Sequence, residues 1–98
     1  VQLRNMQAVG KIAIDLKKTR IDMLSLSGHK LHAPKGVGVL YLKRGTRFRP
    51  LLRGGHQERS RRAGTENTAG IIGLSTALRL AYDHLEGRNA HCRALRQL

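Results

Sequence analysis

The sequence predicts an α/β fold, and more narrowly one piece of a larger α/β domain. Segment 37–42 is apolar on both faces, and segment 21–26 mixes alternation with an apolar centre. Both patterns favour buried strands, which helices cover on both sides of a sheet. Segment 71–85 carries a single apolar stripe at helical spacing. Because the chain supplies helix for only one face of such a sheet, counting layers indicates that the rest of a larger domain is missing.

The two predicted strands are joined by residues 27–36, which contain Gly28, Pro34 and Gly36 as turn formers. A connection of this length without a crossover helix favours antiparallel neighbours. An earlier apolar stretch, 12–14, is short and stops at Asp15.

The C-terminal third is predicted to be helical. Thr65 or Asn67 is suited to cap the start of the first helix. Gly87 is expected to break or kink it, so that 88–98 forms a second helical stretch. Cys92 continues the apolar stripe and is expected to be a buried small hydrophobe. The stripe steps by three and four residues through Ile71, Leu74, Leu78, Ala81 and Leu85.

Composition narrows the functional classes. The 98 residues contain 19 Lys and Arg against 6 Asp and Glu, a formal net charge of +13. A single cysteine excludes an intrachain disulfide framework and any multi-cysteine metal site. No apolar run approaches the roughly 18 residues that a membrane span requires, and Val1–Arg4 lacks a signal-peptide apolar core. Length and charge alone favour a small basic nucleic-acid binder.

The nucleic-acid alternative is weakened by the scarcity of aromatic residues. Single-strand binders interleave basic residues with stacking rings, and this chain has only Tyr41, Phe48 and Tyr82. No helix-turn-helix, RNP-type or zinc-finger pattern is present. The basic stretch is a glycine-rich loop and not a recognition helix.

The segment Ser27-Gly28-His29-Lys30 is the strongest candidate site. It follows directly on a predicted strand, and ligands of α/β folds gather at the carboxyl ends of strands. A hydroxyl, a glycine backbone and an imidazole can donate to a phosphate, and a lysine can pair with an anion or condense with an aldehyde. A polar turn with a solvated lysine explains the same residues equally well.

Other candidate motifs are weaker. Gly36-x-Gly38 lacks the following helix of a dinucleotide loop. The basic loop 54–67 ends at a helix start, where anions are favoured, and Thr65 is its residue best placed to touch a phosphate. Most of its arginines are equally well explained as solvated. The five histidines show no metal-ligand spacing, so we expect no metal site.

Four segments taken together resemble the pyridoxal-phosphate-dependent cysteine desulfurases of the NifS/IscS type, within the class-V aminotransferase-like group. The S-x-H-K tetrad and the following P-K-G-x-G are shared by the wider group. The stretch R-R-A-G-T-E-N points to the NifS/IscS type. The matching segments are 7–11, 22–30, 33–38 and 53–67.

The resemblance implies the type I pyridoxal-phosphate fold, with residues 1–98 as a partial cofactor-binding large domain. Residues 1–64 would supply strands, loops and the cofactor lysine, and 65–98 would be helical. Lys30 matches the catalytic lysine that carries the cofactor and moves protons on the substrate. The other matching cofactor contacts are Ser27 and His29 to the phosphate, Gln7 to the phenolic oxygen, and Thr65 to the phosphate in the neighbouring subunit.

The function implied by the resemblance is conversion of L-cysteine to L-alanine. A separate catalytic cysteine takes the sulfur as a persulfide, which serves iron–sulfur cluster assembly. The implied setting is a cytoplasmic homodimer with sulfur-acceptor or scaffold proteins as partners, and neither nucleic acid nor membrane. Another class-V enzyme, such as an aminotransferase or selenocysteine lyase, and a non-enzymatic basic binding module are the alternatives.

Two positions depart from the family pattern. The family places an aspartate three residues before the glutamine, where it pairs with the pyridine nitrogen, and this chain has Arg4 there. A cation cannot stabilise a pyridinium. Cys92 does not match the catalytic cysteine, which lies in the family far beyond residue 98. We therefore expect the 98-residue chain alone to release no sulfide or alanine from cysteine.

Overall fold

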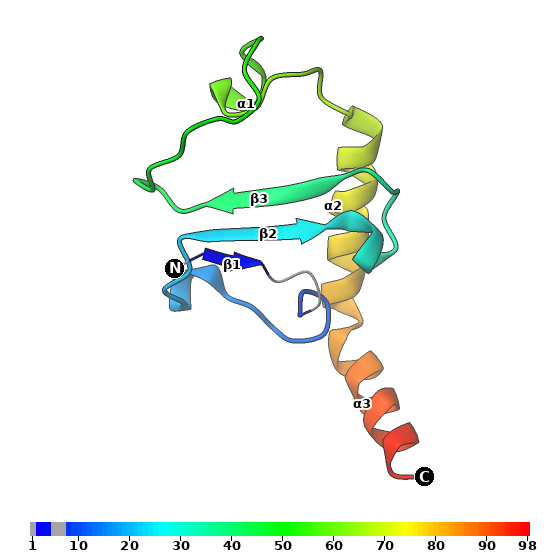
Figure 1. Ribbon diagram of the computed structural model, residues 1–98. Helices are drawn as coiled ribbons and strands as arrows, with labels where there is room; N and C mark the ends of the chain where they lie inside the picture. The colour runs from blue at the N-terminus through cyan, green and yellow to red at the C-terminus, as the bar shows by residue number, and fades with distance from the viewer. Residues whose placement is uncertain (1, 5–7) are drawn as a thin grey trace.

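The computed structural model describes residues 2–4 and 8–98, and it places a small sheet beside one end of a long helix (Figure 1). The sheet has three strands in the order β1-β2-β3. The elements discussed below are β1 (Gln2–Arg4), β2 (Met23–Ser27), β3 (Gly38–Leu42), α1 (Gln57–Ser60), α2 (Thr68–Asp83) and α3 (Leu85–Arg96), with short 3-10 turns η1 (Leu16–Lys18) and η2 (Gly28–Leu31).

The sheet confirms the antiparallel prediction and adds a strand. β2 and β3 pair antiparallel, with Ser27 opposite Gly38. β1 pairs parallel to β2, with Arg4 opposite Ser25. The strand β1 was not predicted, because three residues carry too little alternation to signal a strand. The apolar stretch 12–14 forms no strand; there, only an isolated bridge to Val9 involves Ile12.

The start of α2 and the division between α2 and α3 can each be assigned to a residue. Asn67 caps α2, since its side-chain oxygen accepts a hydrogen bond of 3.0 Å from the backbone N–H of Gly70. Thr65, the other candidate cap, lies outside the helix. The predicted break at Gly87 is wrong: the helices divide at His84, and Gly87 lies inside α3. A glycine inside a helix costs only about 1 kcal/mol relative to alanine, which neighbouring turns can tolerate.

The core lies where α2 meets η2 and the segment that follows β1. Leu74 and Ala81 of α2 are 3% and 2% exposed, whereas Ile71 of the predicted stripe is 44% exposed. The buried cluster consists of Val9, Leu31, Ala33, Leu74, Ala77 and Ala81.

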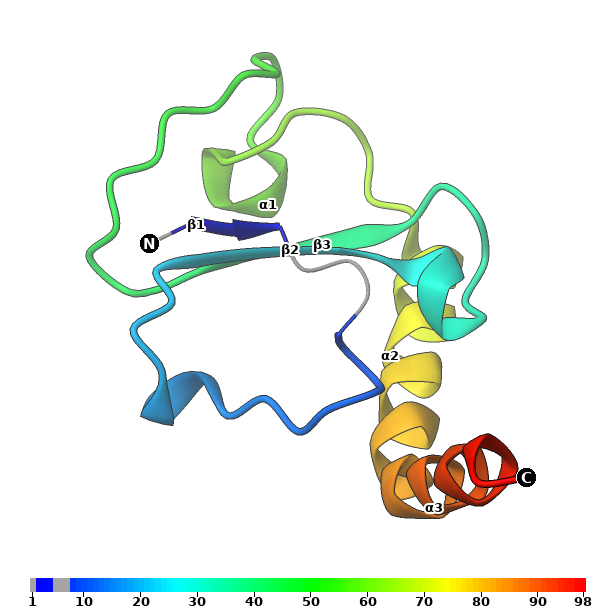
Figure 2. The same ribbon diagram turned by 60° about the horizontal axis from the view of Figure 1, so that its bottom comes forward.

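The helix α3 extends past the sheet and contributes no buried residue (Figures 1 and 2). Cys92 is exposed, so the prediction that it is buried is wrong. The stripe continues along α3, but nothing in the described part of the chain covers it there. A hydrogen bond of 2.9 Å from Asn89 Nδ2 to the carbonyl of Lys11 ties α3 to the remainder of the fold.

Strand β3 is apolar but largely uncovered. Val39 and Leu40 are 38% and 47% exposed, in contrast to the burial expected from their sequence. Loop 43–67 and segment 8–22 lie on opposite sides of the sheet (Figure 2). The radius of gyration is 15.7 Å, against about 13 Å for a compact chain of this length. The sequence supplies helix for only one face of the sheet, and in the structure the uncovered strand residues form exposed apolar surface. No helix in the described ranges has the length and apolarity to cross a membrane.

Candidate functional site

The candidate site lies at the sheet edge where β1 and β2 both end. Parallel strands bring their carboxyl ends to the same edge, and ligand sites of α/β sheets form there. Strand β2 ends at Ser27, and the turn η2 begins at the next residue, Gly28. His29 and Lys30 therefore stand at the carboxyl edge of the sheet, beside α2 (Figure 1).

Backbone hydrogen bonds hold this turn against the start of β3. The N–H of Gly28 donates to the carbonyl of Val37 at 2.8 Å, and the N–H of Ala33 donates to the carbonyl of Gly28 at 3.1 Å. A Cβ on Gly28 would lie 2.9 Å from the Val37 carbonyl oxygen, so only glycine permits this approach. His32 closes the turn with a left-handed φ of 64°.

The turn buries one side chain and exposes two. Leu31 is 8% exposed and belongs to the core cluster, whereas His29 and Lys30 are exposed. Within residues 2–4 and 8–98, no hydrogen bond or ion pair engages the Lys30 amine.

The predicted site residues fall into three groups. Ser27, His29 and Lys30 are brought together within one turn, with Ser27 partly buried. Thr65 is exposed in the loop before α2, and across the described ranges no hydrogen bond connects it with the other three. Gln7 lies outside the described residues.

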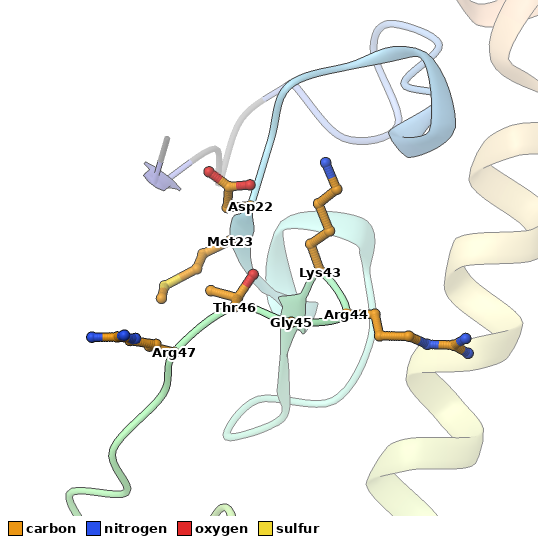
Figure 3. A pocket seen from close by; sticks show the side chains of 7 residues that line it. All are labelled: Asp22, Met23, Lys43, Arg44, Gly45, Thr46 and Arg47. Carbon is orange, nitrogen blue, oxygen red and sulfur yellow. The ribbon is translucent and has the colours of Figure 1, made fainter.

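A basic hollow of about 630 Å³ lies at the opposite end of β2 from Lys30. Its cations do not converge: Arg44 and Arg47 point away from each other, and Lys43 points in a third direction (Figure 3). Such a hollow does not form a focused anion site. Its lining residues are Asp22, Met23, Lys43, Arg44, Gly45, Thr46 and Arg47.

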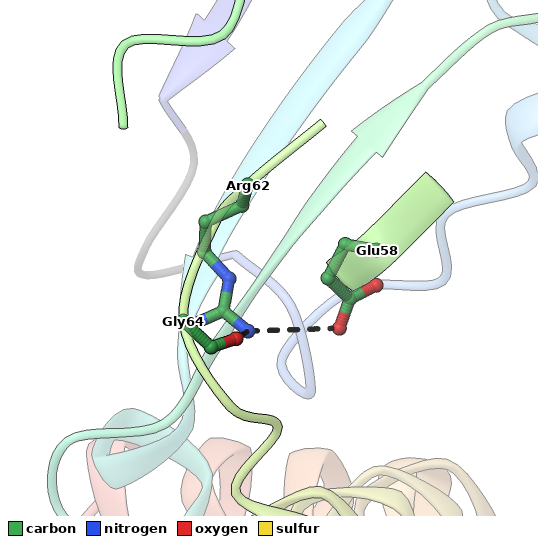
Figure 4. A network of polar contacts seen from close by, with 3 residues as sticks. All are labelled: Glu58, Arg62 and Gly64. Carbon is green, nitrogen blue, oxygen red and sulfur yellow. Dashed lines mark hydrogen bonds and ion pairs between the residues drawn. The ribbon is translucent and has the colours of Figure 1, made fainter. Parts of the chain in front are cut away.

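A second, larger groove of about 1040 Å³ lies between β3, α2 and the basic loop. Its lining includes apolar side chains such as Leu40 and Ile71, together with arginines of the loop. Arg62 approaches Glu58 at 4.0 Å and donates to the carbonyl of Gly64 at 3.4 Å (Figure 4). Both partners of this ion pair are about half exposed, and such pairs contribute little to stability.

The turn α1 in that loop has an unusual backbone. Glu58, Arg59 and Ser60 have φ values of 49°, 56° and 62°, a left-handed conformation that residues other than glycine rarely adopt in succession. Arg59 and Arg61 are exposed. The interpretation of these arginines as solvated side chains thus agrees with their exposure in this chain.

Gly10 lies against the turn that carries Lys30, which the sequence did not indicate. It has a φ of 81°, and a Cβ there would lie 2.7 Å from Leu31 Cδ2. Leu31 directly follows Lys30, so the glycine touches the turn that carries the candidate lysine. The sequence carries no signal of this contact, because it joins residues 21 positions apart.

The fold is that of a family of pyridoxal-phosphate enzymes. The chain belongs to the class-V aminotransferase family, whose model matches residues 5–98. Enzymes of this family depend on pyridoxal phosphate.

Within that family, the chain is similar to the cysteine desulfurases. It is 71% identical over 90 residues to the cysteine desulfurase NifS of Azotobacter vinelandii and 67% identical over 90 residues to a cysteine desulfurase of Gluconacetobacter diazotrophicus. Each alignment covers 92% of this chain and 22% of the relative. The chain therefore spans about a fifth of the length of these proteins.

Solved structures support the same assignment. A NifS-like protein superposes with a TM-score of 0.94 at 42% identity, over 98% of this chain and 26% of that one. SspA in complex with cysteine superposes with a TM-score of 0.75 at 42% identity, over 80% of this chain and 23% of that one. The predictions of an α/β piece of the type I pyridoxal-phosphate fold, and of the NifS-type resemblance, are confirmed.

Proposed function

We propose that this chain forms the lysine-bearing part of a pyridoxal-phosphate-dependent cysteine desulfurase, with Lys30 as the point of cofactor attachment. The observation that carries the proposal is the turn η2. It presents an exposed primary amine at the carboxyl edge of the sheet while Leu31, the next residue, is anchored in the core.

The residues of this turn fit a phosphate-bearing aldehyde. Ser27, the last residue of β2, offers a hydroxyl directly before the turn, and His29 offers an imidazole in the same turn as the amine. The close packing of Gly28 on Val37 fixes the backbone from which these groups extend. Fixed donors suit a phosphate, because its oxygens accept several directed hydrogen bonds.

Each residue has a distinct role in this proposal. When bound, the cofactor supplies an electron sink. Ser27 and His29 would donate hydrogen bonds to its phosphate, and the Lys30 amine would hold its aldehyde carbon and later move protons on the substrate. Gln7 would hydrogen-bond the phenolic oxygen. Thr65 would reach the phosphate of a neighbouring subunit, which agrees with its exposure and its lack of hydrogen bonds to the Lys30 turn.

We propose L-cysteine as the substrate. The complex of the related SspA with cysteine supports this choice, as do the cysteine desulfurases at 67–71% identity. The assembly would be a homodimer that passes sulfur to an acceptor or iron–sulfur scaffold protein in the cytoplasm. Residues 1–64 and 65–98 would then be the strand-and-loop part and the helical part of one cofactor-binding domain.

A different class-V activity, such as an aminotransferase, is the second candidate, because the matching family model carries that description. A complete polypeptide containing this chain distinguishes the two. Release of alanine and thiol-bound sulfur from cysteine supports a desulfurase, whereas amino transfer to a keto acid without sulfur release supports an aminotransferase.

Attachment of the cofactor at Lys30 can be tested on the chain itself. The chain is incubated with pyridoxal 5'-phosphate, reduced with borohydride and mapped by peptide mass spectrometry. We expect the label mainly on Lys30, because the neighbouring serine and histidine hold the phosphate beside that amine. Lys30→Arg keeps the charge and should abolish the main label, while Lys35→Arg, the matched control five residues later, should leave it. A label spread evenly over Lys11, Lys35 and Lys43 contradicts the proposal.

A further inference from the structure

Residues 8–12 make a tight turn that the pairing of the three strands does not require. The N–H groups of Lys11 and Ile12 both donate to the carbonyl of Ala8 at 3.0 Å, and Gly10, directly before Lys11, has a φ of 81°. This turn places the Gly10 backbone between η2 and α2. A Cβ on Gly10 would lie 2.7 Å from Leu31 Cδ2 and 3.3 Å from Ala81 Cβ.

A separation of 2.7 Å between two carbon atoms is far inside their contact distance. Either the Gly10 backbone, Leu31 or Ala81 would therefore have to move. Ala81 is 2% exposed on the rigid α2 and cannot yield. Leu31 is 8% exposed within the core cluster, so its side chain has little room to rotate away. The backbone of η2, to which Leu31 belongs, therefore takes up the part of the movement that the Leu31 side chain cannot.

We propose that Gly10 is a positioning residue for Lys30: its missing side chain lets Leu31 pack against α2 and thereby sets the place and direction of the lysine turn. This inference rests on the proposed role of Lys30.

The chain offers a matched control for the backbone effect. Gly45 has a φ of 86°, almost the same as Gly10, but a Cβ there would have nothing within 4 Å. Gly45 lies beyond β3 in the lining of the basic hollow, at the other end of the sheet from Lys30. Alanine at either position meets the same left-handed strain, and only alanine at Gly10 meets Leu31.

The experiment compares Gly10→Ala with Gly45→Ala in the 98-residue chain. Each protein is incubated with pyridoxal 5'-phosphate, reduced with borohydride and mapped, and the readout is the ratio of label on Lys30 to label on Lys35. We expect Gly10→Ala to lower this ratio about fivefold or more, because the turn that carries Lys30 is displaced, and Gly45→Ala to change it less than about twofold. Circular dichroism records helix content alongside, so a loss of fold is seen separately.

A second variant covers the case in which Gly10→Ala does not fold. Leu31→Val removes the two δ carbons and relieves the contact, so the double variant with Gly10→Ala should regain helix content and preferential labelling of Lys30. A double variant that stays unfolded or unselective overturns the proposal, as does equal labelling of Gly10→Ala and Gly45→Ala. Failure of the unmodified chain to label Lys30 would instead overturn the proposed cofactor role.

Discussion

Lys30 combines an exposed amine with a fixed backbone, and these two properties come from different residues. The amine is exposed because η2 turns away from the core at that position. The backbone is fixed because Leu31, one residue later, is buried, and because Gly28 bonds to Val37 at 2.8 Å. A reactive group benefits from such support, since positioning lowers the entropy cost of bringing it to the reacting atom.

Arg4 stands at the same sheet edge as this lysine. It is the last residue of β1 and pairs with Ser25 of β2, two residues before Ser27. The cysteine desulfurase resemblance calls for an aspartate here, which would pair with the protonated pyridine nitrogen. A positive side chain at this position repels a pyridinium instead of stabilising it.

The replacement Arg4→Asp is therefore expected to tighten the binding of pyridoxal 5'-phosphate. A new charge-assisted hydrogen bond is worth about 1.5–3 kcal/mol, so the affinity should rise roughly tenfold or more. Absorbance titration with the cofactor measures the dissociation constant. Arg4→Asn is the matched control, because it removes the cation without adding a carboxylate. Equal affinities for the unmodified chain and Arg4→Asp would show that Arg4 is not at the pyridine nitrogen.

Among the elements, α2 does most to hold the site. It provides three of the six residues of the core cluster, and Leu31 of η2 belongs to the same cluster. The start of α2 depends on Asn67, whose Oδ1 satisfies the N–H of Gly70. An uncapped helix start leaves backbone donors without partners.

The variant Asn67→Ala should lower the free energy of unfolding by about 1 kcal/mol, because it removes that cap. Urea denaturation followed by circular dichroism at 222 nm measures the change. Asn67→Asp retains a side-chain oxygen and should remain within a few tenths of a kcal/mol of the unmodified chain. Thr65→Ala, two residues earlier, should likewise have little effect. If Thr65→Ala lowered the free energy of unfolding as much as Asn67→Ala, the assignment of Asn67 as the cap would be wrong.

The sequence was sufficient for the elements that carry a strong local pattern. The strands before and after residues 27–36, their antiparallel pairing and the existence of α2 all follow from apolar runs and turn formers. The placement of the Ser27–Lys30 motif at a strand end follows from the same pattern. These features depend on neighbours close in the chain.

Features that depend on distant partners were not predictable. The strand β1 exists through its pairing with β2, about 20 positions later. The exposure of Cys92 and Ile71 reflects the lack of a covering layer, which a helical stripe cannot reveal. The close contact of Gly10 with Leu31 is a meeting of two segments that sequence patterns treat separately.

At the scale of the whole molecule, charge and shape act together. The net charge is +13, and the ion pair of Arg62 with Glu58, at 4.0 Å, is half exposed and screens little of it. The chain is extended, with dimensions of 54 × 31 × 17 Å. Like charges spread over a small fold oppose its compact state, while exposed apolar surface over β3 and α2 offers little compensation.

Salt should therefore stabilise this chain. Raising sodium chloride from about 20 mM to 200 mM shortens the screening length from roughly 20 Å to under 10 Å, so the repulsion weakens and the melting temperature should rise by a few degrees. Thermal unfolding followed by circular dichroism measures how the melting temperature changes with salt concentration.

The double variant Arg44→Glu with Arg47→Glu lowers the net charge to +9. Both side chains are exposed and point away from each other at the end of the sheet remote from Lys30 (Figure 3). That variant should melt at a higher temperature in low salt and respond less to added salt. An unchanged slope, or a melting temperature that falls with salt, would show that self-repulsion does not limit the stability of this fold.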